Sequence, residues 1–185
     1  GVILDHLNDF LGEEGFQFGP DVATSSRANI GGMIGNNSAG AHSIRYGHTS
    51  GHLRSVECVL SNGERARFEP VSRDEARRRA GDGTLEARLY RDIPSLIEEN
   101  ADLIRDRYPD LSRNSTGYAL DRFLDGLDDG VVDFTKLVCG SEGTLASVVQ
   151  ATLDVVPAPE RKGALVYHAE SVLEALRVNA LMVER

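Results

Sequence analysis

Residues 30–47 read Ile-Gly-Gly-Met-Ile-Gly-Asn-Asn-Ser-Ala-Gly-Ala-His-Ser-Ile-Arg-Tyr-Gly. The glycines at 31, 32, 35 and 40 remove Cβ atoms that would hold a ligand away from the backbone, and they allow positive φ at little steric cost. Exposed N–H groups in a tight turn attract anions. If residues 32–37 open a short helix, its first N–H groups and its dipole add to that attraction. The stretch therefore predicts a cradle for a pyrophosphate.

Two common phosphate-binding motifs do not fit this stretch. The pattern Gly-x-x-x-x-Gly-Lys-Ser/Thr is absent, and no lysine precedes Lys136, which disfavours a P-loop NTPase. Residues 32–35 do not form Gly-x-Gly-x-x-Gly, and residues 21–26 do not read as a buried strand, so a Rossmann domain is also disfavoured. A glycine-rich surface loop without a ligand stays open as the alternative.

Three motifs carry a resemblance to a known family. Residues 28–40, Ala-Asn-Ile-Gly-Gly-Met-Ile-Gly-Asn-Asn-Ser-Ala-Gly, are followed by Arg-Tyr-Gly at 45–47. They closely resemble the FAD-binding (PCMH-type) domain of the vanillyl-alcohol oxidase / p-cresol methylhydroxylase superfamily. Residues 140–146, Gly-Ser-Glu-Gly-Thr-Leu-Ala, are similar to a segment that passes the flavin's adenosine end in the FAD-linked D-lactate / D-2-hydroxyglutarate dehydrogenase branch. Residues 114–121, Asn-Ser-Thr-Gly-Tyr-Ala-Leu-Asp, are similar to that branch's Asn-x-x-Gly-Tyr-x-Leu element.

The resemblance implies an α+β fold. The chain would be the second subdomain of a PCMH-type FAD-binding domain, with a mostly antiparallel sheet flanked by helices. Residues 1–157 would form this subdomain, and residues 158–185 would begin a substrate-binding cap domain. In relatives a first subdomain with its own phosphate loop comes earlier in the chain. We therefore expect this chain by itself to bind FAD weakly or not at all and to be inactive.

The resemblance also implies FAD as the cofactor. The glycine-rich loop would approach its pyrophosphate and ribityl chain through backbone atoms, and residues 142–143 would meet the adenine and ribose. Val149 would pack against the adenine, although core packing explains it equally well. A turn requirement is the alternative for each glycine, and an Asx-turn or helix cap is the alternative for Asn36. The expected cofactor contacts are Ile30, Gly31, Gly32, Gly35, Asn36, Gly40, Tyr46, Gly47, Glu142, Gly143 and Val149.

A flavin at this site implies an oxidoreductase. The chain would be part of an FAD-dependent enzyme that oxidises a D-2-hydroxy acid, of the lactate, glycolate or 2-hydroxyglutarate type, to the 2-oxo acid by hydride transfer to flavin. Relatives place the base and the carboxylate-binding arginines in the cap domain, so we predict no catalytic residue here, and the electron acceptor stays unknown. The alternatives are a non-redox nucleotide- or phosphate-binding module and an inactive fragment.

Charge and hydropathy narrow the partners and the location. The formal net charge of −9 disfavours binding to nucleic acid or anionic membranes. No apolar run approaches the roughly 18 residues of a membrane span, and the amino end does not read as a signal peptide. We therefore predict a cytoplasmic protein without a membrane span. The basic run 77–79 is flanked by Asp74, Glu75 and Asp82, which predicts a solvated helix face.

Metal sites are disfavoured by spacing. The two cysteines, Cys58 and Cys139, lie far apart and lack the paired spacing of zinc or iron–sulfur ligands, so we predict both to be buried, reduced and unbridged. Gly47 and Gly51 break the helix that would align His48 with His52, and no acidic residue lies between His42 and His52. We predict no metal.

Hydrophobic periodicity and turn residues predict the elements. They are a helix over 2–10, a hairpin of strands 53–60 and 64–68, a helix from 72 or 74 to 79, helices within 85–108 with Pro94 beginning a new one at its first position, a β-rich run over 144–156, a strand over 164–168 and a helix over 171–185.

Overall fold

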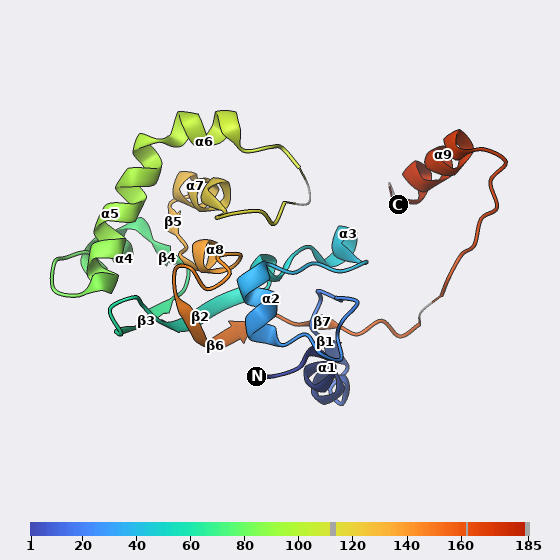
Figure 1. Cartoon of the computed structure of the whole chain (residues 1–185), viewed down its shortest axis with the longest axis horizontal. Helices are drawn as coiled ribbons and strands as arrows, with labels where there is room; N and C mark the ends of the chain where they lie inside the picture. The colour runs from blue at the N-terminus through green and yellow to red at the C-terminus, as the bar shows by residue number, and fades with distance from the viewer. Residues whose placement is uncertain (112–113, 162, 184–185) are drawn as a thin grey trace.

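The computed structural model describes residues 1–111, 114–161 and 163–183. Its helical elements are α1 (Leu4–Gly12), α2 (Ile30–Asn36), α3 (Ser43–Tyr46), the 3-10 helix η1 (Thr49–Gly51), α4 (Arg73–Arg79), α5 (Leu85–Glu99), α6 (Ala101–Arg107), α7 (Leu120–Asp128), α8 (Thr135–Val138) and α9 (Val172–Val183). Its strands are β1 (Phe16–Gln17), β2 (Leu53–Val59), β3 (Arg65–Phe68), β4 (Val71–Ser72), β5 (Val131–Val132), β6 (Ser147–Leu153) and β7 (Val156–Pro157). This is an α+β fold, as the sequence predicted (Figure 1).

The strands pair antiparallel throughout the described residues. The central sheet has the order β3-β2-β6, and the short strands form the pairs β1–β7 and β4–β5. Strands β2 and β3 form the predicted hairpin with Val56 opposite Phe68, and Gly63 takes φ 85° in the turn. Strand β6 returns from the far end of the sequence to place Leu153 opposite Leu53. The mostly antiparallel sheet is therefore confirmed.

Two apolar clusters hold the fold together. In the larger, one face of the sheet packs against α4 to α8, and the ring of Phe134 lies 5.0 Å from Phe68, 5.0 Å from Tyr90 and 5.3 Å from Phe123. The smaller cluster joins α1, β1, α2 and β2. Helix α2 buries Ile30, Met33 and Ile34 there, so its glycines face outward.

Pro94 lies inside α5, and the prediction that it begins a new helix is wrong. Ile93 and Ile97 both pack against the larger cluster, so tertiary burial on each side of the proline keeps this helix continuous. The break comes at Asn100, where the Nδ2 group donates to the carbonyl of Leu96 at 2.8 Å. Residues 164–168 likewise form no strand, since no described strand pairs with them.

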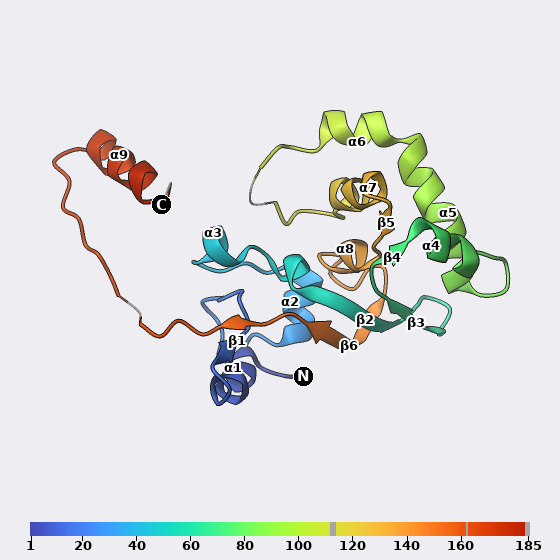
Figure 2. The same cartoon turned by 180° about the vertical axis from the view of Figure 1, so that it is seen from behind.

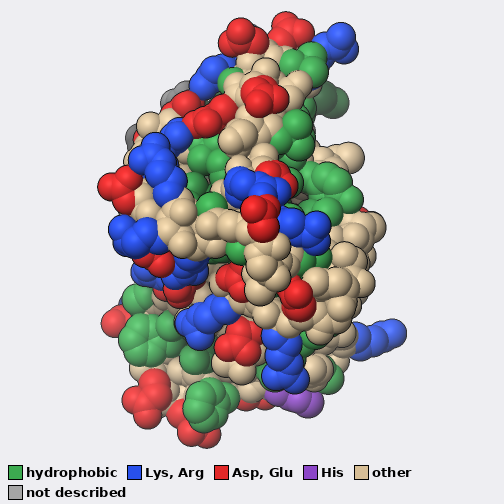
Figure 3. Space-filling model, turned by 90° about the vertical axis from the view of Figure 1, so that its left-hand side faces the viewer, with side chains coloured by type: hydrophobic (Ala, Val, Ile, Leu, Met, Phe, Trp, Pro, Cys, Tyr) green, Lys and Arg blue, Asp and Glu red, His purple; other side chains and the backbone are tan. Residues whose placement is uncertain are grey.

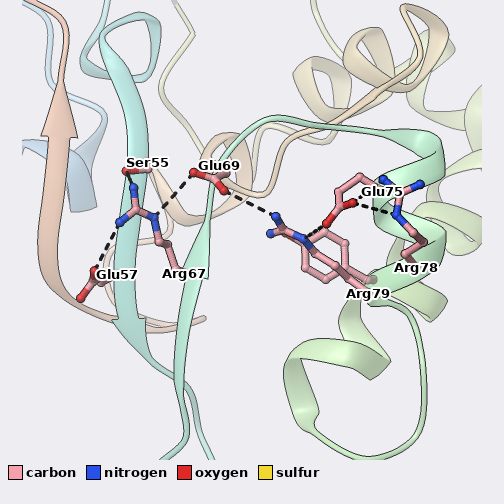
Figure 4. Close-up of polar contacts among 8 residues, drawn as sticks. Ser55, Glu57, Arg67, Glu69, Glu75, Arg78 and Arg79 are labelled. Atoms are coloured by element: carbon pink, nitrogen blue, oxygen red, sulfur yellow. Dashed lines mark hydrogen bonds and ion pairs between the residues drawn. The ribbon is translucent and has the colours of Figure 1, made fainter.

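The basic run belongs to α4, which begins at the predicted cap, because the Ser72 hydroxyl accepts from the Glu75 N–H. Arg78 pairs with Glu75 on the exposed side, as a solvated face requires. Arg79 turns inward instead, with its guanidinium 2.8 Å from Glu75 and 5.6 Å from the ring of Tyr90 (Figure 4). Charges of both signs intermingle on this side of the molecule (Figure 3).

The chain leaves the body after β7 and runs to α9, which lies apart from the other elements in both views (Figures 1 and 2). Within the ranges described, no helix combines the length and apolar character needed to cross a membrane.

Candidate functional site

Helix α2 begins at a side-chain cap. Asn29 has extended backbone angles, and its Oδ1 accepts a 2.7 Å hydrogen bond from the N–H of Gly32. The N–H of Ile30 donates to the carbonyl of Val2 at 2.9 Å. A short helix is present, but it begins at Ile30 instead of Gly32, and two of its first three N–H groups already bind protein acceptors. The start of the helix therefore offers fewer free N–H groups to an anion than the sequence suggested.

The outward glycines of α2 form a strip without side chains, and we call Gly31, Gly32 and Gly35 the glycine strip. A Cβ atom at Gly31 or Gly32 would lie 3.6 or 3.3 Å from Asn29 Oδ1, and one at Gly35 would lie 3.8 Å from the Cα of Glu142. A Cβ at Gly31 or Gly35 would therefore make only ordinary contacts, whereas one at Gly32 would require the Asn29 side chain to shift slightly. Each glycine costs a helix interior about 1 kcal/mol relative to alanine. The strip suits the close approach of something outside the helix.

The turn that follows α8 lies directly on the carboxyl end of α2. The N–H of Gly140 donates to the carbonyl of Ile34, and the N–H of Glu142 donates to that of Gly35, both at 2.9 Å. Gly140, Glu142 and Gly143 take φ of 88°, 52° and 78°, which bends the turn toward the helix. The first two sequence motifs therefore form one structural unit, and Glu142 and Gly143 lie beside the glycine strip.

The third motif reaches the same place. The hydroxyl groups of Tyr118 and Thr144 lie 2.9 Å apart, and a Cβ at Gly140 would come within 3.7 Å of the carbonyl oxygen of Gly117. A cavity of about 60 Å³ lies where the motifs meet. It is lined by Asn37, His48, Ser50, Tyr108, Asn114, Ser115, Thr116, Gly117, Tyr118, Ala119, Asp121, Arg122, Lys136 and Cys139.

Asn37 organises this cavity. It ends α2 in the left-handed conformation, with φ 47° and ψ 52°, and it is buried. Its Oδ1 accepts from the Ser50 N–H at 2.9 Å and faces the Cys139 sulfur at 3.5 Å. Lys136 lies beside it, with Nζ donating to the Ser50 carbonyl at 2.7 Å and 3.8 Å from a carboxylate oxygen of Asp133.

Sequence reasoning did not select Asn37 or Lys136 as site residues. A sequence signal existed for Asn37, because asparagine after a short glycine-containing helix favours the left-handed cap. Lys136 had no such signal, since only the tertiary fold brings α8 against η1.

Other predicted contacts lie on a loop. Residues 39–48, here called the 39–48 loop, are closed at their base by a bridge between Ala39 and His48, and α3 forms the tip. The Tyr46 carbonyl accepts from His52 Nε2 at 2.7 Å, and Gly47 takes φ 69°. At the loop's entrance, Asn36 Nδ2 donates to the Ser38 hydroxyl at 3.3 Å.

Gly40 has an internal reason to be glycine, unlike the glycine strip. It is buried, and a Cβ there would overlap the carbonyl oxygen of Asp21. Val149 lies elsewhere, on the outer face of β6, where it is 57% exposed and lines a shallow groove with Glu57, Arg65 and Arg67. Contacts of Gly40 and Val149 with FAD stay predictions.

His42 and His52 contact other residues, and both cysteines are buried. The side chain of His42 pairs with Asp21, and among the described residues no set of three or more histidine, cysteine or acidic side chains is placed to hold a metal. Cys58 and Cys139 are buried and unbridged, as predicted. Burial raises the pKa of the Cys58 thiol to about 11 and that of Cys139 to about 12.

Comparison with known proteins agrees with this geometry. Residues 1–69 match the family described as FAD binding domain. The chain is 38% identical over 184 residues to D-2-hydroxyglutarate dehydrogenase of Pantoea ananatis (strain AJ13355) and 36% identical over 185 residues to that of Escherichia coli (strain K12). Each match covers 100% of this chain and 18% of the relative. Glycolate oxidase subunit GlcD of Bacillus subtilis (strain 168) is 27% identical over 172 residues, which cover 93% of this chain and 25% of that protein.

This chain therefore spans about a fifth of the length of the D-2-hydroxyglutarate dehydrogenases that it resembles. The family match covers α1, α2, the 39–48 loop and the β2–β3 hairpin. The turn at 140–143 and the motif at 114–121 lie outside that match and inside the longer similarity. Residues 1–69 are thus similar to the family described as FAD binding domain, and the whole chain is similar to part of the D-2-hydroxyglutarate dehydrogenases.

Proposed function

We propose that this chain forms part of the FAD site of an oxidoreductase that oxidises a D-2-hydroxy acid to the corresponding 2-oxo acid. Relatives named D-2-hydroxyglutarate dehydrogenase and glycolate oxidase subunit support a 2-hydroxy acid of the 2-hydroxyglutarate, glycolate or lactate type. Because the chain spans 18% of the former relatives, the activity is a proposal for the complete gene product.

The observation that carries the proposal is the glycine strip. Gly31 and Gly32 are exposed and Gly35 is half-buried on a helix whose other side is buried, and a Cβ at Gly31 or Gly35 would make only ordinary contacts. The turn containing Glu142 and Gly143 lies at the end of the strip. The residues present therefore fit a flat, extended ligand that approaches the backbone closely, as a dinucleotide does.

In this proposal the chain binds and orients the cofactor. FAD, when bound, supplies the acceptor for the hydride from the substrate carbon. The glycine strip brings the α2 backbone to the cofactor, and the turn at 140–143 fixes the direction of the strip. Lys136 offers positive charge near the meeting point of the three motifs, partly balanced by Asp133.

A non-redox nucleotide-binding module is the second candidate, because the same strip suits any dinucleotide. The two candidates differ in one measurable property. In the complete gene product, anaerobic addition of D-2-hydroxyglutarate, D-lactate or glycolate should bleach the visible flavin band, and L-2-hydroxyglutarate should not. A bound flavin that none of these acids reduces would contradict the proposed activity and leave the binding role.

A further inference from the structure

We infer that Asp21 is a positioning residue, which holds the 39–48 loop in the conformation that receives the flavin; this inference rests on the proposed function. The loop carries Tyr46 and Gly47, both predicted cofactor contacts. Asp21 belongs to the segment between β1 and α2, outside the glycine-rich motif. Its role therefore depends on a tertiary contact.

Asp21 contacts the loop at three points. One carboxylate oxygen, Oδ1, accepts from the backbone N–H of His42 at 3.1 Å, and the other, Oδ2, pairs with His42 Nδ1. The carbonyl of Asp21 occupies the space where a Cβ of residue 40 would stand, so Gly40 lets the two backbones touch. These contacts fix the position and direction of the first half of the loop, around Gly40 and His42.

Side-chain contacts connect His42 with Tyr46 in the second half of the 39–48 loop. The His42 and Tyr46 rings meet edge to face with centroids 6.4 Å apart, and the guanidinium of Arg45 lies 5.4 Å from the Tyr46 ring centroid. His52 Nε2 holds the Tyr46 carbonyl at 2.7 Å. A shift of His42 therefore moves the ring that packs on Tyr46.

Geometry, more than charge, gives the Asp21 contact its effect. The side chains of His42 and Asp21 are 70% and 37% exposed, and exposed ion pairs contribute little to global stability. The carboxylate of Asp21 accepts hydrogen bonds from both the backbone N–H and the ring of His42, and this pair of bonds still restricts the orientation of His42. Loss of Asp21 should therefore loosen the loop locally while the rest of the fold stays as stable as before.

The test uses three variants of the complete gene product. Asp21→Ala removes both hydrogen bonds, and Asp21→Asn keeps an oxygen for the His42 N–H. Asp128→Ala is the control, because Asp128 pairs with Arg105 at 2.7 Å in another exposed ion pair, between α6 and α7. Three quantities are measured: the rate of tryptic cleavage after Arg45 in the FAD-free protein, the FAD dissociation constant, and the urea midpoint of unfolding.

For Asp21→Ala we expect cleavage about tenfold faster and the FAD dissociation constant about tenfold higher, the scale of one lost charge-assisted hydrogen bond. The urea midpoint should shift no more than in Asp128→Ala, and Asp21→Asn should recover most of both losses. If Asp21→Ala fails to fold, His42→Gln, which loses the ring contact and keeps the backbone one, should show the same two changes at smaller size.

An unchanged cleavage rate, or an FAD dissociation constant within about twofold of the wild type, would overturn the role of Asp21. A midpoint that falls in proportion to FAD affinity would also overturn it, since that result indicates general destabilisation. A wild-type protein that binds no FAD would overturn the proposed function itself, and the cleavage rates would then still show whether Asp21 holds the loop.

Discussion

The backbone N–H of Glu142 donates to the carbonyl oxygen of Gly35 at 2.9 Å, which joins two segments from opposite halves of the sequence. The neighbouring bond from Gly140 to Ile34 has the same length. Carbonyl groups at a helix end need partners, and here the turn supplies them. Helix α2 and the 140–143 turn therefore stabilise each other, and disruption of one should weaken the other.

We expect Gly140→Ala to destabilise the chain by about 1 to 3 kcal/mol, the usual cost of a strained backbone. Gly140 has φ 88°, and its Cβ would stand 3.3 Å from the Cβ of Asn37. Urea denaturation measures the loss. Gly12→Ala is the control, because no atom lies within 4 Å of a Cβ there and its φ is ordinary. Equal midpoints for the two variants would contradict the coupling of turn and helix.

Gly32→Val in the complete gene product should lower the flavin-to-protein ratio sharply. A branched side chain would fill the outer face of α2, where we place the cofactor, while valine has a helix propensity no worse than that of glycine. Stability should therefore fall less than flavin content. Absorbance of purified protein gives the ratio, and circular dichroism reports the fold. Gly31→Val, whose Cβ would lie 3.6 Å from the nearest atom, should lose flavin in the same way. Gly12→Val is the control and should retain full flavin, because nothing lies within 4 Å of a Cβ there. Full flavin content in folded Gly31→Val and Gly32→Val would remove the cofactor from the strip.

The thiols of Cys58 and Cys139 should resist iodoacetamide in the folded chain. Burial raises their pKa values to about 11 and about 12, and the thiolate is the reacting form. At pH 8 a thiol with a pKa of about 12 is ionised to roughly one part in ten thousand, so alkylation should accelerate as pH rises. Mass spectrometry counts the modified thiols, with the guanidinium-unfolded chain as the control that reacts at both. Rapid alkylation of the folded chain would contradict the burial of the thiols. A mass lower by two hydrogen atoms would show a disulfide and contradict the prediction that both cysteines are reduced.

By itself, the 185-residue chain should bind FAD more weakly than micromolar. Gly31 and Gly32 are exposed, and the cavity lined by Asn37 at the carboxyl end of α2 is about 60 Å³, far below the roughly 300 Å³ of an enclosing ligand pocket. Each exposed hydrogen bond contributes about 0.5 to 1.5 kcal/mol, whereas association costs at least about 4 kcal/mol. Fluorescence titration of the isolated chain measures the affinity. Micromolar binding would mean that this chain supplies most of the cofactor contacts.

Local sequence predicted those features that depend on local chemistry. Alternation and turn residues predicted the β2–β3 hairpin, and Ser72 was one of the two positions predicted for the start of α4. The resemblance implied that the glycine-rich loop and residues 142–143 meet one cofactor, and the bonds from Gly140 and Glu142 to α2 are consistent with it.

Features that depend on distant contacts could not be predicted in this way. Pro94 is tolerated within α5 because the core holds the helix on both sides of it. The contact between Gly40 and Asp21 depends on how the segment before α2 folds back, which no local pattern encodes. Lys136 lies at the site because α8 packs beside η1, and this contact joins residues that are distant in the sequence.

The absorbance spectrum of the complete gene product, followed by identification of the ligand released on denaturation, tests the central claim most directly. We predict flavin bands in the visible range and release of about one FAD per chain. Release of a non-flavin nucleotide from folded protein, or no binding of added FAD, would contradict the assignment of the glycine strip and the 140–143 turn to a flavin site.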